Sequence, residues 1–123
     1  MIHLDTSVVI DALTGPRRSL PALRRAIAEG HRLAISAIVL FEWRCGPRAQ
    51  RELVDQAALL PDTSVVAFGL AEASAAATLY RTLRSPRGRE ADLAIAATAL
   101  TRRAALWTLN RRDFADVPGL DLY

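Results

Sequence analysis

Four acidic residues are the side chains of this sequence best placed to do chemistry: Asp5, Glu42, Asp92 and Asp113. The first follows a short apolar segment, 2–4, and the last lies shortly after another, 104–109. The other two interrupt apolar helical patterns. A carboxylate in apolar surroundings loses hydration, and a charged partner or a bound metal ion offsets that cost. Four such groups in one place would repel one another, and the oxygen-preferring cations Mg²⁺ and Mn²⁺ suit a cluster of this kind.

Each of these acids also has a purely structural interpretation. Asp5 could serve a turn or helix cap at the end of a strand, and Glu42 could lie on a solvated helix face. Asp92 could complement the dipole of a helix N-terminus, and Asp113 could be an ordinary turn residue. Two acids follow strand ends and two interrupt apolar helices, so their joint placement favours one shared site.

Short apolar segments alternate with longer helical patterns along the chain, which predicts the elements that position these acids. Strands are predicted at 2–4, 33–36, 63–68, 104–109 and 120–122. Helices are predicted at about 6–13, 20–29, 37–45, 49–60, 71–83 and 89–103, with Thr6 or Ser7 as the first N-cap. The helix at 89–103 is apolar over most of its circumference, so we expect it to be central and buried.

The alternation of strands and helices predicts an α/β fold with a short parallel sheet of about four to five strands, flanked by helices on both faces. In an open sheet of this type, ligands bind beyond the carboxyl ends of the strands. Asp5 and the segment 110–113 are expected at that edge.

All 16 basic residues besides histidine are arginine, and the sequence contains no lysine. This composition excludes a P-loop, Schiff-base chemistry and a protein kinase, each of which needs a lysine. A metal-free ribonuclease would use paired histidines or a lysine, but His3 and His31 lie far apart in the sequence. The single cysteine, Cys45, excludes an intrachain disulfide framework and a Cys-rich zinc site.

With 123 residues, 51% of them hydrophobic and 24% charged, the chain is expected to form one domain over 1–123. The N-terminus lacks a basic leader, and the longest strongly apolar stretch, 33–41, is far shorter than the ~20 residues of a membrane span. We therefore expect a cytoplasmic protein without membrane contact. A net charge of +3 suggests polyanionic partners, although GC-rich coding bias would produce the same arginine-rich composition.

Four segments carry a more specific signal: LDTSVVID (Leu4–Asp11), SAIVLFEWRCG (Ser36–Gly46), ADLAIAATAL (Ala91–Leu100) and TLNRRDFADVPGL (Thr108–Leu120). In this order, spread over nearly the whole chain, they resemble the PIN-domain ribonucleases, specifically the toxins of VapBC toxin–antitoxin pairs. The resemblance implies a PIN-like domain and a Mg²⁺-dependent endoribonuclease, with Mn²⁺ able to substitute. It further implies a type II toxin that cleaves RNA such as tRNA or rRNA and inhibits translation, a cognate antitoxin and a homodimer.

The resemblance also implies that the four acids are catalytic and ligate metal. Asp113 lies three residues after Asn110 in the last segment, and we expect it to complete the set. Asn110, where family members often carry an acid, is expected to be a neighbouring polar contact. Thr6 and Thr108 are similar to hydroxyl residues that orient the acids or the bound water, although a helix cap is an equal interpretation for Thr6.

Of the 13 acidic residues, four belong to the candidate site. The other nine acids and the 16 arginines together give a net charge of +7. The surface around a negative site is therefore distinctly positive, as RNA binding requires. The arginines nearest the acids are the candidates for phosphate contacts, with solvated surface charge as the alternative: Arg87, Arg89, Arg111 and Arg112. Trp43 could stack on bases or lie in the core, Trp107 is expected in the core, and His3 is expected to be structural.

Three other classes of protein share some of these features. A response-regulator receiver domain needs a functional lysine, and a Rossmann-like nucleotide-binding domain needs a glycine-rich loop after a strand; the sequence has neither. A non-catalytic or degenerate PIN-like RNA-binding module remains an alternative, because Asn110 stands where an acid is common.

Overall fold

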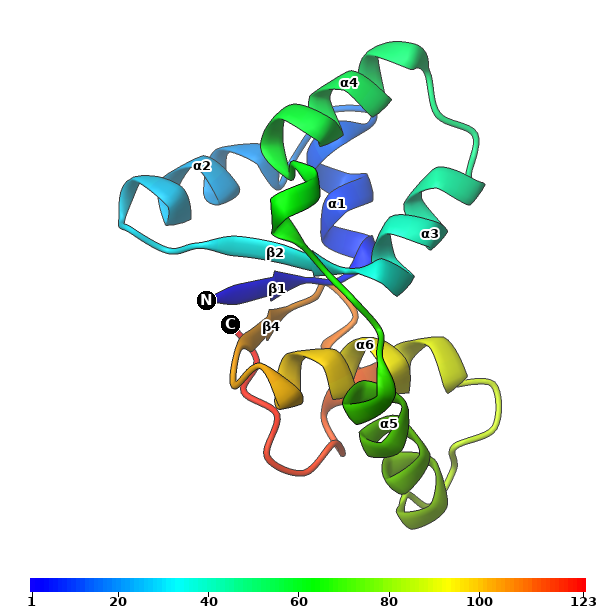
Figure 1. Cartoon of the computed structure of the whole chain (residues 1–123). Coiled ribbons are helices and arrows are strands. Elements are labelled where there is room, and N and C mark those ends of the chain that lie inside the picture. Colours follow the sequence, from blue (N-terminus) through cyan, green and yellow to red (C-terminus); the bar gives the residue numbers. More distant parts are fainter.

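The sheet at the centre of the protein has four parallel strands in the order β3-β2-β1-β4 (Figure 1). They are β1 (Ile2–Leu4), β2 (Leu33–Ser36), β3 (Val65–Val66) and β4 (Ala105–Trp107). The computed structural model describes all residues, 1–123. Ile2 lies opposite Leu33 on one side and Ala105 on the other, so β1 is a central strand. The predicted parallel α/β sheet is confirmed, with four strands.

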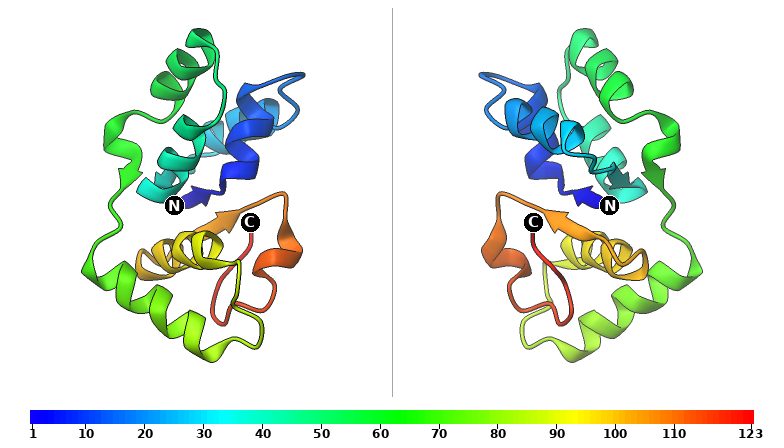
Figure 2. Two further views of the ribbon diagram at one scale, coloured as in Figure 1. Left: turned by 90° about the vertical axis from the view of Figure 1, so that its right-hand side faces the viewer. Right: turned by 90° about the vertical axis from the view of Figure 1, so that its left-hand side faces the viewer.

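Six α-helices cover the two faces of this sheet. They are α1 (Thr6–Leu13), α2 (Leu20–Ala28), α3 (Ala37–Cys45), α4 (Gln50–Leu59), α5 (Leu70–Thr82) and α6 (Glu90–Thr101). Figures 1 and 2 show α1–α4 on one side of the sheet and α5 and α6 on the other. Two 3₁₀ turns, η1 (Asp62–Ser64) and η2 (Arg111–Phe114), complete the structure. None of the helices combines the length and apolar character that crossing a membrane requires.

Two strand predictions and one cap prediction differ from the structure. The predicted strand at 63–68 is reduced to Val65–Val66, because the residues before it form the η1 turn. The segment 120–122 is not a strand, since it follows Pro118–Gly119 and meets β4 only through the bridge between Leu122 and Leu106. Asp5, rather than Thr6 or Ser7, holds the N-cap position of α1.

Helix α6 is the central helix of the fold, as predicted. All its residues from Leu93 to Ala99 are buried, and four of these seven are alanines. Side chains this small allow α5 and the sheet to pack closely on opposite sides of α6, where the packed area removes apolar surface from water. The first turn of α6, which carries Asp92, is thereby fixed to the sheet.

Trp43 is fully buried on α3, which answers the question that the sequence left open. It is a core residue and is not available to stack on nucleotide bases. The guanidinium of Arg48 lies 4.2 Å from the centre of its ring and donates from Nε to the Trp43 carbonyl oxygen at 2.9 Å. Trp107 is partly buried against the core and contacts the Tyr123 ring, with 4.9 Å between ring centres.

His3 lies in the middle of β1 with 1% of its surface exposed, and neither ring nitrogen has a hydrogen-bond partner. Its predicted structural role is consistent with this burial. Burial, assisted by the positive charges of Arg102 and the N-terminus, lowers the pKa of His3 from 6.5 to about 4. The neutral imidazole is therefore the form that the folded protein holds at physiological pH.

The low pKa of His3 predicts a loss of stability in acid. Between pH 6.5 and pH 4 the unfolded chain binds a proton at His3 that the folded protein does not, so the free energy of unfolding falls as the pH falls. The loss is on the order of 2–3 kcal/mol at pH 4. In His3→Leu we expect this component of the melting-temperature profile to disappear, whereas in the control His31→Gln, at an exposed position, it persists. An unchanged profile in His3→Leu would contradict this interpretation.

Candidate active site

The carboxyl edge of the sheet brings together residues that are distant in sequence. Asp5 directly follows β1, and Thr108 directly follows the neighbouring strand β4. Ser36 ends β2 and caps α3 by accepting a hydrogen bond from the backbone N–H of Val39 at 3.1 Å. This cap starts the helix that carries Glu42. Because all strands run in parallel, these chain segments leave the sheet at the same edge, where ligands bind in folds of this type.

The carboxylate of Asp5 is held by two hydroxyl groups and is 4% exposed. Its Oδ2 accepts hydrogen bonds from Ser7 Oγ and Thr108 Oγ1, both at 2.8 Å. The same hydroxyls accept from the backbone N–H groups of Leu109 at 3.1 Å and Asn110 at 2.9 Å. Each hydroxyl thus fixes both the acid and the loop after β4. The sequence indicated Ser7 only as a possible helix cap and not as a partner of Asp5, although its spacing two residues after Asp5 was an available signal.

Glu42 is fixed by the first turn of α1. Its Oε1 accepts a hydrogen bond of 2.6 Å from Thr6 Oγ1, which joins α1 to α3 across 36 residues of sequence. Thr6 lies inside the helix and its hydroxyl contacts Glu42, so the alternative interpretation of Thr6 as the helix cap is wrong. Glu42 is half-buried, and its Oε2 accepts no hydrogen bond from the protein.

Asp92 is half-buried in the first turn of α6, and its carboxylate receives no hydrogen bond from any side chain. Burial, together with the negative charges of Asp5, Asp113 and Glu42, raises the pKa of Asp92 from 3.8 to about 6, while Arg89 opposes the shift. The other three candidate acids therefore all act electrostatically on Asp92. A residue that merely complements the helix dipole would not have three carboxylates around it.

Asp113 and Asn110 lie at the exposed margin of this cluster. Asp113 is in the η2 turn, and Asn110 occupies the position before it. Neither side chain forms a hydrogen bond, and the contribution of Asp113 to the pKa of Asp92 places its charge near the other acids. The backbone N–H of Asn110 donates to Thr108 Oγ1, so this residue contacts the cluster through its main chain.

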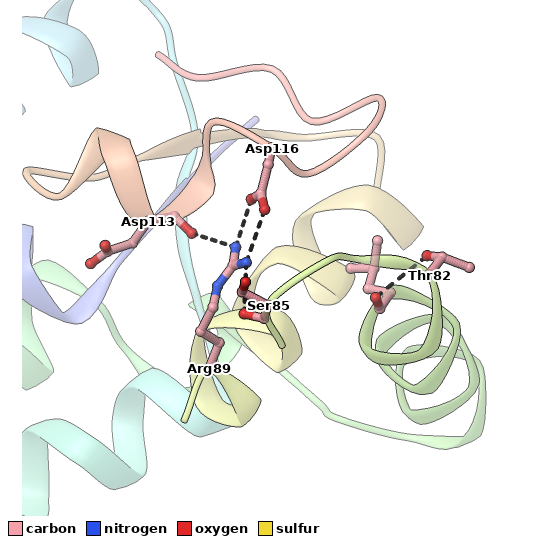
Figure 3. A network of polar contacts seen from close by, with 6 residues as sticks. Thr82, Ser85, Arg89, Asp113 and Asp116 are labelled. Atoms are coloured by element: carbon pink, nitrogen blue, oxygen red, sulfur yellow. Dashed lines mark hydrogen bonds and ion pairs between the residues drawn. The ribbon is translucent and has the colours of Figure 1, made fainter. Parts of the chain in front are cut away.

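Arg89 connects the loop before α6 to the segment that carries Asp113 (Figure 3). Its Nη1 and Nη2 donate to the two carboxylate oxygens of Asp116 at 2.9 and 2.6 Å. Nη2 also donates to the carbonyl oxygen of Asp113 at 2.9 Å, and Nη1 to that of Ser85 at 3.4 Å. These contacts raise the pKa of Arg89 and lower that of Asp116. The Asp113 carboxylate points away from this guanidinium, so Arg89 holds the backbone and leaves the acid free.

The four candidate arginines consequently differ in what they contact. Arg89 uses its guanidinium within the protein, which leaves it little capacity for a phosphate. Arg111 is exposed and donates from Nη1 to the carbonyl oxygen of Tyr123 at 3.0 Å. Arg87 and Arg112 are exposed and form no ion pair or side-chain hydrogen bond.

Comparison with known families agrees with this arrangement. The model of the PIN domain family matches residues 2–120. The chain belongs to the PIN domain family. The resemblance inferred from the four sequence segments is confirmed at the level of family.

Solved structures of similar fold match this PIN domain along its whole length. A chain of VapBC2 from Rickettsia felis, bound to a DNA fragment from their promoter, is 25% identical with a TM-score of 0.79, covering 100% of this chain and 98% of that chain. A chain of a toxin–antitoxin complex from Klebsiella pneumoniae is 28% identical with a TM-score of 0.74. The match covers 98% of this chain and 95% of that chain. A chain of DNA-bound VapBC from Salmonella typhimurium shares the fold at 21% identity, with a TM-score of 0.77 and coverage of 99% and 96%. No curated protein matches the sequence significantly.

The donor set of this PIN domain fits a hydrated hard cation. No three His, Cys, Asp or Glu side chains lie close enough together to form a metal-binding group by themselves. The donors are nevertheless all carboxylates, and Asp5 Oδ1 and Glu42 Oε2 accept no hydrogen bond from the protein. Mg²⁺ keeps several of its waters and usually binds through one or two carboxylates. An open group of acids, with water between some of them and the ion, meets that preference.

The four acids differ in exposure and line none of the three hollows of the protein surface. Asp5 is buried, Glu42 and Asp92 are half-buried, and Asp113 is exposed. Small-molecule sites, by contrast, are concave and largely enclosed.

Proposed function

We propose that this PIN domain is a metal-dependent endoribonuclease that acts as the toxin of a type II toxin–antitoxin pair. The observation that carries the proposal is Asp92: a half-buried carboxylate without a side-chain partner, among three other carboxylates from β1, α3 and η2. Such an arrangement is unfavourable for the protein alone and becomes favourable with a divalent cation. We propose Asp5, Glu42, Asp92 and Asp113 as the residues that hold Mg²⁺, or Mn²⁺ in its place.

The divalent cation, when bound, supplies charge neutralisation at the phosphate and an activated water. The residues of the chain determine the geometry of this chemistry. Asp5 is oriented by Ser7 and Thr108, and Glu42 by Thr6, so their carboxylates are in place before any ligand binds. The raised pKa of Asp92 belongs to the metal-free protein, and a bound cation would favour the charged carboxylate that holds it.

RNA is the polymer that this surface favours. The exposed arginines beside the acids, Arg87, Arg111 and Arg112, are proposed to contact backbone phosphates. The high positive charge of the remaining surface offsets the repulsion between RNA and a negative site. Structured RNA such as tRNA or rRNA is the proposed substrate, and its cleavage in the cytoplasm would inhibit translation.

The partner proposals come from the similar proteins. The Klebsiella pneumoniae structure is a toxin–antitoxin complex and the Rickettsia felis structure is a VapBC assembly, each aligned with nearly the whole of this chain. We propose that a cognate antitoxin binds this PIN domain and covers its acids, and that the toxin forms a homodimer.

A non-catalytic RNA-binding PIN domain is the second candidate function. The observation that favours it is the absence of three acids within direct metal-binding distance of one another. Such a protein would retain RNA without cutting it, whatever cation is present.

A cleavage assay separates the two candidates. Purified protein is incubated with end-labelled folded and single-stranded RNA in Mg²⁺, in Mn²⁺ and in EDTA. We expect defined cleavage products in Mg²⁺ or Mn²⁺ and none in EDTA, with activity restored when Mg²⁺ is added in excess. RNA that is bound but intact in every cation would support the second candidate.

The contacts of Arg89 predict a positioning role that kinetics can distinguish from phosphate binding. In Arg89→Met we expect kcat to fall about tenfold while KM changes little. The reason is that a small displacement of a catalytic group lowers the rate by up to about 10²-fold. Arg89→Lys should recover only part of the loss, since lysine lacks the two-pronged geometry. The control is Arg102→Met. Arg102 lies at the C-terminal end of α6, opposite the end that carries Asp92, and its substitution breaks an ion pair with Glu72. A raised KM with unchanged kcat in Arg89→Met would instead indicate phosphate contact.

A further inference from the structure

A hollow outside the group of acids lies where α5 ends and the loop to α6 begins. Its volume is about 510 Å³, and its lining residues are Tyr80, Arg84, Ser85, Pro86 and Arg87. Two arginines and one tyrosine therefore line the same space. The other two hollows of the protein have a mainly hydrophobic lining, so this one is chemically distinct.

The positive charge at this hollow is not compensated by the protein. Arg84 and Arg87 are exposed, and neither takes part in any of the ion pairs of the structure. Arg81, in the last turn of α5, is also exposed and unpaired. The nearest acid along the chain, Glu90, accepts a hydrogen bond from the backbone N–H of Gly88 at 3.4 Å. Unpaired positive charges that line one hollow favour an anionic ligand.

A short chain of contacts connects this hollow to the candidate active site. Ser85, in its wall, accepts a hydrogen bond from Arg89, and Arg89 donates in turn to the backbone of Asp113 (Figure 3). One arginine side chain thus separates the wall of the hollow from the segment that bears a site acid. The hollow and the segment that bears Asp113 therefore adjoin the same arginine, Arg89.

We propose that this hollow is a nucleotide-binding subsite for RNA, an inference that rests on the proposed ribonuclease function. Arg84 and Arg87 bind a backbone phosphate one or a few nucleotides from the site of cleavage, since guanidinium groups match phosphate oxygens in pairs. Tyr80, with 36% of its surface exposed, stacks against a base. A nucleotide offers both an anion and a planar ring, which matches this lining better than an acidic peptide does.

The test measures RNA binding apart from cleavage. A labelled single-stranded RNA is titrated with full-length protein in EDTA, and binding is followed by fluorescence anisotropy for the wild type, the double variant Arg84→Ala/Arg87→Ala, and Tyr80→Ala. The matched control is Arg24→Ala/Arg25→Ala, which removes two unpaired arginines from α2, on the opposite side of the molecule in Figure 1. Circular dichroism and melting temperatures verify that each variant is folded.

We expect the double variant to bind about tenfold more weakly and the control to bind within twofold of the wild type. The slope of log Kd against log salt should decrease by about 0.7 in the double variant, the value for one lost phosphate contact with a single strand. Tyr80→Ala should weaken binding while leaving that slope unchanged. If the double variant and the control lose the same affinity for RNA, the loss follows from the lower overall positive charge, and the subsite is overturned.

Failure of the subsite and failure of the proposed function give different results. If the wild type cleaves RNA and the double variant binds it with unchanged affinity, the subsite is overturned and the nuclease stands. If the double variant loses RNA binding but the wild type never cleaves in Mg²⁺, the subsite stands and the nuclease fails. If RNA binding is unchanged and affinity for the antitoxin decreases, the hollow is a protein-binding site and the RNA proposal is overturned.

Discussion

Asp92→Asn is expected to reduce RNA cleavage by about 10³-fold or more while leaving the protein folded. The substitution preserves the shape of the side chain but removes the charge that would hold a divalent cation among three other acids. Losses of this size are typical when a group that acts on the reacting atoms is removed. The matched control is Glu90→Gln, an exposed acid in the same turn of α6, which should keep activity within about twofold of the wild type. Full activity in Asp92→Asn would refute the assignment of this site.

The same substitution is expected to raise the melting temperature of the metal-free protein. Burial and three neighbouring carboxylates raise the pKa of Asp92 to about 6, against 3.8 in the unfolded chain. Between pH 4 and pH 6 the folded state therefore binds more protons, so the free energy of unfolding decreases as the pH rises through this window. Asn removes that decrease, and the variant should melt a few degrees higher than the wild type at pH 7–8 and at a similar temperature near pH 4. A clear drop at pH 7–8 would identify Asp92 as a structural acid.

Addition of Mg²⁺ is expected to stabilise the wild-type protein strongly at neutral pH. A ligand that binds only the folded state contributes about 2.7 kcal/mol when its concentration is a hundred times its Kd. At this site the ion also relieves the mutual repulsion of the carboxylates, which is the reason that the pKa of Asp92 is raised beyond the effect of burial. Differential scanning fluorimetry in EDTA and in Mg²⁺ measures the shift. We expect an increase of several degrees in the wild type and in Glu90→Gln, and little or none in Asp92→Asn.

The control for this experiment is monovalent salt at the same ionic strength. Salt screens exposed charges without occupying a site, and its effect varies with ionic strength alone. If NaCl reproduces the whole Mg²⁺ shift, or if Asp92→Asn retains it, the stabilisation has another origin than a cation at the four acids.

The parts of the fold and site that follow local patterns were predictable from sequence. Apolar segments and helical periodicity located β1, β2 and every helix within a few residues. Asp92 was identifiable because a carboxylate in an apolar helix needs a partner or an ion, and the structure surrounds it with other acids. The length of β3 was overestimated, because Thr63, whose β-branched side chain favours a strand, and Ser64 belong to the η1 turn.

The parts that depend on distant contacts were not predictable. Arg89 and Asp116 are 27 residues apart, and no spacing indicates that their side chains meet and hold the backbone of Asp113. Ser7 orients Asp5 only because the loop after β4 supplies an N–H group to the same hydroxyl. Trp43 was open to two interpretations, since its neighbour Glu42 faces the site while Trp43, one residue along the helix, faces the core.

Paramagnetic relaxation by Mn²⁺ tests most directly the central claim that one divalent-cation site joins β1, α3, α6 and η2. Backbone amide signals of the isotope-labelled protein are recorded while Mn²⁺ is added at low stoichiometry. We predict that signals around Asp5, Glu42, Asp92 and Asp113 broaden first and together, that excess Mg²⁺ restores them, and that Asp92→Asn abolishes the effect. Broadening centred on any other part of the chain, or unchanged signals around Asp92, would contradict the account.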